Sequence, residues 1–202
     1  MRVKLGETIL RINISFAAAV TLTLILDESG LCAAALFCCV VHELGHIACL
    51  LILGEKPGLI ELSFYGIKLE RRCASGLKSF GEIVIYASGP AANFALSALI
   101  FVCADTDGLK KAAVISLCVG LFNLLPCRPL DGGNLLEQFL KRRTDEETCE
   151  RICFYVSCMI LAPMFAAGIT LLITSGNITL LAVSGYVAAA TVVTKKEKRF
   201  KI

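Results

Sequence analysis

Both histidines of the chain lie in one short apolar stretch, VVHELGHIACLLILG, at residues 40–54. His42 and His46 are four residues apart, so a helix would place their side chains on one face with Cβ atoms about 5–6 Å apart. Two imidazole nitrogens at that spacing can bind one metal ion. Glu43 directly follows the first histidine, where its carboxylate can reach a water molecule bound to that ion. This HExxH pattern is typical of hydrolytic zinc sites, in which the glutamate acts as general base.

A purely structural interpretation would make the two histidines satisfied core residues and pair Glu43 with a basic group. However, no Lys or Arg lies in the apolar segment 31–53 to neutralise that carboxylate. A charged group at the centre of a bilayer costs about 2.5 to 3.5 kcal/mol. A divalent cation supplies the missing positive charge and gives all three groups a role. We therefore predict a single Zn²⁺ ion at His42 and His46.

A catalytic zinc takes three protein ligands and keeps one position open for water. The sequence has no third histidine. Cys39 and Cys49 lie on the motif face, but each is seven residues from the farther histidine, about 10.5 Å along the helix axis. One ion cannot reach all three groups, so the third ligand must come from another segment.

The best candidate for that ligand is Asp131, in the segment LFNLLPCRPLDGGNLL at residues 121–136. Two prolines break the helix before it. Gly132 and Gly133 predict a tight turn that directs the carboxylate inward. The alternative is an ordinary helix cap, because Asp is a favoured N-cap residue and a helical pattern follows.

The composition predicts a membrane protein. Hydrophobic residues make up 56% of the chain, charged residues 18%, and the mean hydropathy is +0.75. A helix needs about 20 apolar residues to cross a bilayer. On that criterion we expect an all-α polytopic membrane protein, a single domain over residues 1–202, with six spans near 9–26, 31–53, 81–104, 112–126, 152–174 and 177–194. The first is read as an uncleaved span because no small-x-small cleavage site follows it.

The basic residues predict the orientation of these spans. If the amino terminus is cytoplasmic, 18 of the 20 Lys and Arg residues fall in inside segments, and only Lys110 and Lys111 fall outside. Basic residues tend to stay on the cytoplasmic side. We therefore expect both termini in the cytoplasm, and we read the net charge of +3 as a topology signal rather than as affinity for nucleic acid.

Two further patterns concern the loops and the thiols. The segment PGLIELSFYGIKLERR at 57–72 alternates apolar and polar residues and predicts a short β-hairpin bent near Gly66, with a plain loop as the alternative. An exposed edge there could bind an unwound peptide by strand addition. The 11 cysteines show no CxxC pair, which favours reduced, buried thiols over a disulfide framework.

Three motifs together resemble the site-2 proteases, a family of intramembrane zinc metalloproteases. They are HELGH at 42–46, GPAAN at 89–93, and the pattern of Asn123, Pro126, Leu130, Asp131 and Gly132. The resemblance covers residues 31–143, which correspond to the three-helix catalytic core of that family. It implies His42, His46 and Asp131 as zinc ligands, Glu43 as catalytic base, and Asn123 and Asn93 as residues that hold substrate.

The six-span layout is similar to the branch that processes a membrane-associated pro-sigma factor during sporulation, stage IV sporulation FB, and so implies a bacterial cell membrane. We expect neither a PDZ nor a CBS domain. The expected partners are a transmembrane or membrane-associated protein substrate and the lipid bilayer, with a regulatory membrane partner as a further candidate. The competing functional classes are a zinc transporter or metal-binding membrane protein, and a catalytically silent membrane scaffold.

Overall fold

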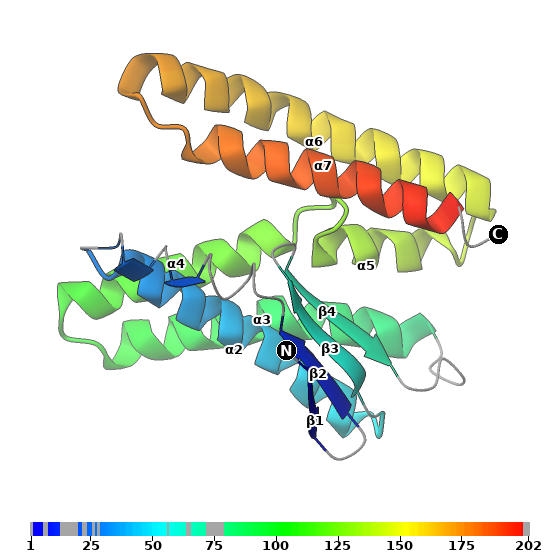
Figure 1. Ribbon diagram of the computed structural model, residues 1–202, viewed down its shortest axis with the longest axis horizontal. Helices are drawn as coiled ribbons and strands as arrows, with labels where there is room; N and C mark the ends of the chain where they lie inside the picture. Colours follow the sequence, from blue (N-terminus) through cyan, green and yellow to red (C-terminus); the bar gives the residue numbers. More distant parts are fainter. Residues whose placement is uncertain are drawn as a thin grey trace. The chain divides into compact units, whose positions relative to one another are not determined.

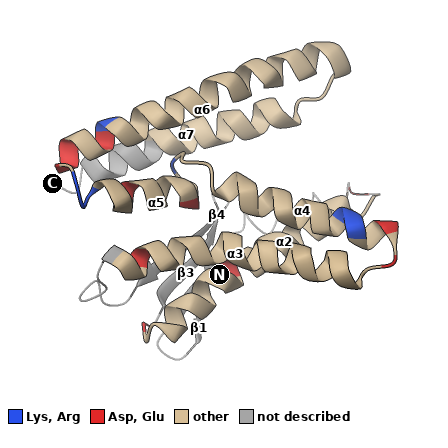
Figure 2. Cartoon of the chain, turned by 180° about the vertical axis from the view of Figure 1, so that it is seen from behind, with Lys and Arg blue, Asp and Glu red and all other residues tan. Residues whose placement is uncertain are grey.

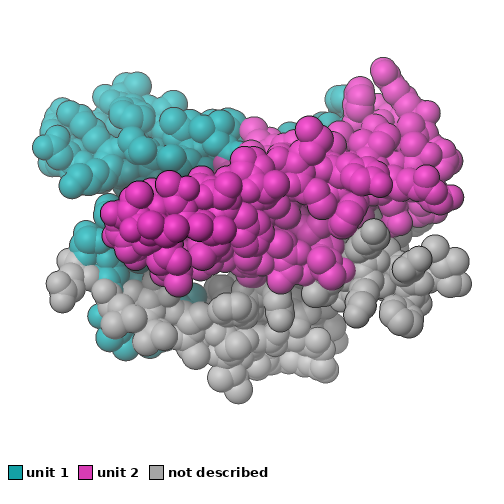
Figure 3. Space-filling model, turned by 90° about the horizontal axis from the view of Figure 1, so that it is seen from above, with its two compact units in different colours: residues 1–121 teal, residues 122–202 magenta. Residues whose placement is uncertain are grey.

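The computed structural model describes residues 2–5, 8–12, 20, 21, 24, 25, 27, 29–55, 57–63, 66–71 and 79–199. The chain forms two compact units, residues 1–121 and 122–202, which Figure 3 shows in different colours. The elements follow one another as β1 (Arg2–Leu5), β2 (Thr8–Ile12), α2 (Leu31–Ile52), β3 (Pro57–Ser63), β4 (Gly66–Arg71), α3 (Ser79–Cys103), α4 (Asp107–Asn123), α5 (Asp131–Leu140), α6 (Glu146–Ser175) and α7 (Thr179–Arg199) (Figure 1).

The strands form one four-stranded sheet in the order β1-β2-β3-β4. β1 and β2 pair antiparallel, β2 and β3 pair parallel, and β3 and β4 pair antiparallel with Ser63 opposite Gly66. The predicted hairpin is therefore present, but it belongs to a larger sheet. A purely α-helical class is too narrow, because the amino-terminal segment supplies two further strands.

Among the residues that the structure describes, three helices are long and apolar enough to cross a membrane: Leu31–Ile52, Phe80–Cys103 and Glu146–Ser175. In Figure 2 the charged residues of α6 gather in its first turns, and the rest of that helix is uncharged. α7 contains a shorter apolar stretch, Thr179–Val192, and α4 has only 17 residues. The predicted first span, 9–26, begins in strand β2, and most of its remainder lies outside the described residues.

Helices α2 and α3 approach closely because glycines face one another at their contact. A Cβ atom on Gly45 would lie 2.7 Å from the carbonyl oxygen of Ser88 and 2.8 Å from the Cβ of Ala92. Only a residue without a side chain fits there. The small residues of the GPAAN segment thus allow the two backbones to pack closely, as small residues do between membrane helices.

Helix α4 packs against α3 through hydroxyl groups that bond to backbone carbonyls across the contact. The Ser97 hydroxyl donates to the Ala113 carbonyl at 2.9 Å, and the Ser116 hydroxyl donates to the Asn93 carbonyl at 2.9 Å. Both serines are buried. Such bonds satisfy polar groups that would otherwise be exposed to hydrocarbon.

In the second unit, α6 and α7 form an antiparallel pair (Figure 1). Gly176 ends α6 in the left-handed conformation, with φ of 68°, which glycine adopts without strain. Asp145 begins α6 and accepts a hydrogen bond from the Thr148 backbone N–H at 2.9 Å. That bond lowers the pKa of the Asp145 carboxyl. The core of this unit joins Cys127, Leu161 and Val187.

We predict that Gly45→Ala destabilises the protein by about 1 to 3 kcal/mol, because the added methyl group must push α2 and α3 apart. Thermal unfolding of the purified protein in detergent measures this change. Gly108→Ala is the matched control, since nothing lies within 4 Å of a Cβ at that position. Equal unfolding temperatures for the Gly45 variant and the wild type would contradict the close packing.

Candidate metal centre

The candidate metal centre begins on α2, where the motif side chains occupy one turn. His42 and His46 are 4% and 7% exposed, and Glu43 is half-buried. No other residue of α2 carries an acidic or basic side chain. The two imidazoles and the carboxylate are therefore the polar groups of an otherwise apolar helix.

A backbone carbonyl on α3 orients the second histidine. The Nδ1 atom of His46 lies 2.7 Å from the carbonyl oxygen of Ile85. A carbonyl can only accept, so the proton is on Nδ1 and the lone pair is on Nε2. The Ser88 hydroxyl donates to the same carbonyl at 2.6 Å. Histidines that bind a metal through one ring nitrogen typically donate a hydrogen bond from the other, as His46 does to Ile85, because this bond fixes both the tautomer and the ring plane.

The two histidines present their Nε2 atoms to each other. The distance between the Nε2 atoms of His42 and His46 is 3.2 Å, and the ring planes are 82° apart. Two nitrogens bound to one tetrahedral zinc at about 2.0 to 2.1 Å would themselves be separated by about 3.3 Å. The spacing of this pair therefore fits a shared zinc ion. Without an ion, a proton on one Nε2 atom must separate the two lone pairs.

Gly89 on α3 leaves the space beside the imidazoles. A Cβ atom at this position would lie 2.3 Å from the His46 Nε2 atom and 2.7 Å from the His42 Nε2 atom. Any side chain here would occupy the place that an ion needs. The first residue of the GPAAN segment thus serves the histidine pair as well as helix packing.

Asp131 belongs to the second unit and is the first residue of α5. The N-cap residue is Leu130, in extended conformation, so the alternative role of Asp131 as the helix cap is not what the structure has. The carboxylate is half-buried. Carboxylate oxygens are among the atoms that zinc takes as ligands together with histidine nitrogens.

The prediction of a tight turn at Gly132 and Gly133 is wrong. Both glycines lie inside α5, and neither has a positive φ. Their role is steric, because a Cβ on Gly132 would lie 2.1 Å from the Leu124 carbonyl oxygen, and one on Gly133 would lie 2.7 Å from the Arg128 nitrogen. The glycines let the start of α5 rest directly on the backbone of the preceding loop.

The two asparagines have different surroundings. Asn123 is the last residue of α4 and is half-buried. Asn93 is fully buried in α3, and its Cβ would lie 3.3 Å from a Cβ on Gly120 of α4. Asn93 is thus part of the α3–α4 contact in this conformation, and its predicted contact with substrate stays a prediction.

Sequence reasoning missed four functional groups. The Ile85 carbonyl and the Ser88 hydroxyl carry no motif signal, because any residue supplies a carbonyl. Gly89 belongs to the GPAAN motif, but the motif alone does not indicate that this glycine lies beside the histidines. The buried Arg128 carries no local signal either, because its partner Glu137 lies nine residues later on α5. Only the folded chain brings these two charges together.

Comparison with solved structures defines the fold. The structure of a site-2 protease from Methanocaldococcus jannaschii matches with a TM-score of 0.69 at 23% sequence identity, covering 95% of this chain and 93% of that one. The chain therefore has the fold of a site-2 protease. Residues 105–164 match the model of peptidase family M50.

Two curated proteins are similar in sequence to parts of this chain. The zinc metalloprotease MJ0392 of Methanocaldococcus jannaschii is 25% identical over 165 residues, 73% of this chain and 44% of that protein. A protein of Mycobacterium tuberculosis, provisionally named the zinc metalloprotease Rip3, is 42% identical over 67 residues, 28% of this chain and 17% of that protein. The chain thus spans less than half the length of either relative.

We predict that Gly89→Ala lowers zinc affinity by about tenfold or more, because the methyl group overlaps the metal-facing nitrogens. Competition with a chromophoric chelator on the purified protein measures the affinity. Ala91→Ser, at an exposed position on the same helix, is the control and should bind zinc as the wild type does. Unchanged affinity in the Gly89 variant would place the ion elsewhere.

Proposed function

We propose that this chain is an intramembrane zinc metalloprotease that cleaves a transmembrane or membrane-associated protein. One observation carries the proposal: two buried imidazole nitrogens lie 3.2 Å apart, with a glutamate beside them, in a helix apolar enough to cross a membrane. The names of the relatives, both zinc metalloproteases, support the same chemistry.

His42, His46 and Asp131 would hold one zinc ion in this proposal. When bound, zinc lowers the pKa of a water molecule and polarises the carbonyl group that the water attacks. The Ile85 carbonyl keeps His46 in the tautomer that offers Nε2. The carboxylate of Asp131 would balance part of the charge of the ion.

Glu43 would act as the general base. Its carboxylate accepts a proton from the attacking water and later passes that proton to the leaving amine. Its position in the turn that carries both ligands keeps it within reach of the same water. Asn123, at the carboxyl end of α4, would donate hydrogen bonds to the substrate backbone near the scissile bond, and we assign Asn93 a secondary role in holding substrate.

A transmembrane substrate must unwind before cleavage, because its peptide bonds are held in helical hydrogen bonds. β4 is an edge strand of the sheet and follows the HELGH helix by one strand. Among the described residues β4 pairs with β3 alone, so the backbone groups of its other edge could bond to an extended peptide, as in other cases of strand addition. We propose β4 as the strand that receives the unwound substrate.

The proposed membrane, orientation and branch of the family rest on the sequence pattern. Six apolar segments and the distribution of basic residues favour a bacterial cell-membrane protease with both termini in the cytoplasm. This layout supports the sporulation branch, whose substrate is a membrane-associated pro-sigma factor, and regulated intramembrane proteolysis with a regulatory membrane partner. A zinc transporter is the second candidate, since it too would use histidines within the membrane.

We predict that Glu43→Gln keeps zinc bound but lowers the cleavage rate by about 10²- to 10⁴-fold, the usual contribution of a general base. Cleavage of a co-expressed membrane substrate and the zinc content of the purified protein are measured together. Asp131→Asn should lower both zinc content and cleavage, because it removes a charged ligand.

Glu82→Gln is the control, since Glu82 lies in the first turn of α3 and not in the motif. Wild-type cleavage by the Glu43 variant would rule out this mechanism. Zinc flux across proteoliposomes without any cleavage would favour the transporter.

We predict that a photoreactive amino acid at Lys68, in β4, cross-links to bound substrate in the Glu43→Gln background, where substrate is bound but not cleaved. The same probe at Lys4, in β1 on the opposite edge of the sheet, is the control and should not cross-link. Mass spectrometry of the adducts identifies the attached peptide. Equal cross-linking at both positions would contradict a substrate strand at β4.

A further inference from the structure

Arg128 is a charged residue buried in the loop that leads to Asp131. It stands between Pro126 and Asp131 and is 5% exposed. Its neighbour Cys127 packs with Leu161 and Val187 in the core of the second unit. A buried charge is expensive unless it is paired, so its place in this loop calls for a specific role.

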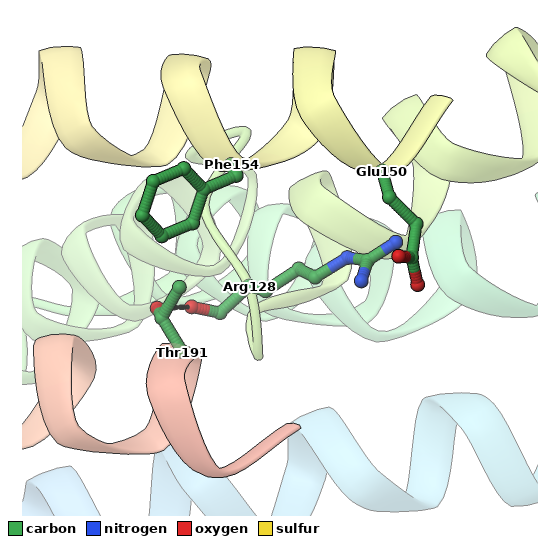
Figure 4. Close-up of a pocket in the computed structure, with 4 residues that line it drawn as sticks. All are labelled: Arg128, Glu150, Phe154 and Thr191. Atoms are coloured by element: carbon green, nitrogen blue, oxygen red, sulfur yellow. Dashed lines mark hydrogen bonds between the residues drawn. The ribbon is translucent and has the colours of Figure 1, made fainter. Parts of the chain in front are cut away.

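Three different helices hold Arg128. Its guanidinium Nη2 lies 2.6 Å from the Oε2 atom of Glu137 on α5. Its backbone N–H donates to the Ser157 hydroxyl of α6 at 3.3 Å. Its carbonyl accepts a hydrogen bond from the Thr191 hydroxyl of α7, the contact that Figure 4 draws as a dashed line. One residue thus ties the loop to α5, α6 and α7.

The partner Glu137 is itself buried and shared between two cations. Its Oε1 atom lies 2.9 Å from the Lys141 Nζ atom, one turn later on α5. Burial alone would lower the pKa of Lys141, but the hydrogen bond and the charge of Glu137 outweigh it, so the pKa is raised. Figure 4 shows the Arg128 guanidinium extended toward Glu150 of α6. Glu137, the acid paired with Arg128, is therefore held by two cations, Arg128 and Lys141.

The ion pair closes the segment 128–137 on itself, and Asp131 lies inside that closed segment. Between Arg128 and Asp131 there are only Pro129 and Leu130, so the chain has little freedom there. On the other side, α5 links Asp131 to Glu137 as a rigid helix. Gly133 brings the first turn of α5 onto the Arg128 backbone nitrogen. The ion pair and this close contact therefore restrict how the start of α5 can move relative to the loop.

We propose that Arg128 and Glu137 form a positioning pair that fixes the Asp131 carboxylate for metal binding. The inference rests on the proposed function, because it takes Asp131 as a zinc ligand. A well-packed apolar pair can often replace a buried ion pair without loss of stability. The charged pair is therefore explained better by the precision it gives to α5 than by the stability it adds.

A zinc-binding cycle on the full chain in detergent tests this proposal. The double variant Arg128→Met with Glu137→Met removes both charges of the buried pair. Lys141 loses its partner but stays in contact with water, because its side chain is 42% exposed. Zinc affinity is measured by chelator competition for this pair in the wild-type background and in the Asp131→Ala background. We expect the double variant to lose about tenfold in affinity when Asp131 is present and nothing further when Asp131 is absent.

The exposed pair Arg151 and Glu147 on α6 gives the matched control, because its removal deletes the same charges at side chains that are 69% and 76% exposed. That variant should bind zinc normally. If the buried double variant does not fold, Arg128→Lys replaces it, since lysine keeps the charge but not the planar fork of donors. It should lower affinity only when Asp131 is present.

Each outcome separates the two claims. Normal affinity in the Arg128 variants, together with a loss in Asp131→Ala, overturns the positioning pair alone. The same loss in both backgrounds also overturns it, because a general structural effect does not act through Asp131. Unchanged affinity in Asp131→Ala removes Asp131 from the ligand set, and then both proposals fail.

Discussion

Two imidazole nitrogens held 3.2 Å apart inside an apolar helix are the constraint on which this structure depends. The lone pairs of two such atoms repel each other unless a proton or a metal ion lies between them. The Ile85 carbonyl fixes the proton of His46 on the opposite nitrogen. The pair is thus oriented to bind a cation. Burial strengthens the attraction between the nitrogens and that cation, because little water is present to weaken it.

Glycines at single positions of the surrounding helices leave the space that this pair needs. Gly45 lets α3 approach α2, and Gly89 then leaves room beside the histidines. In the second unit, Gly132 and Gly133 do the same for the loop before Asp131. Substitution of any of these glycines would move a candidate ligand without touching its chemistry. The glycines of these motifs therefore have a steric role, in addition to the chemical role of the other motif residues.

The sequence predicted the HELGH helix, the hairpin and a membrane protein because each leaves a local pattern of apolar and polar residues. It gave the wrong reason for Gly132 and Gly133, since glycines at a turn and glycines in a crowded helix look alike in one sequence. It placed a helix over residues that begin with strand β2, because an apolar strand and the start of a span share the same composition. The pairing of Arg128 with Glu137 depends on tertiary contacts, which no local pattern encodes.

X-ray absorption at the zinc edge of the purified protein tests the central claim most directly, because the chain offers 11 cysteines as well as two histidines. We expect one zinc per chain with only nitrogen and oxygen neighbours at about 2.0 to 2.2 Å, including the outer-shell signal of two imidazoles. A sulfur neighbour at about 2.3 Å, or a spectrum that His46→Ala leaves unchanged, would contradict a centre built on the histidine pair.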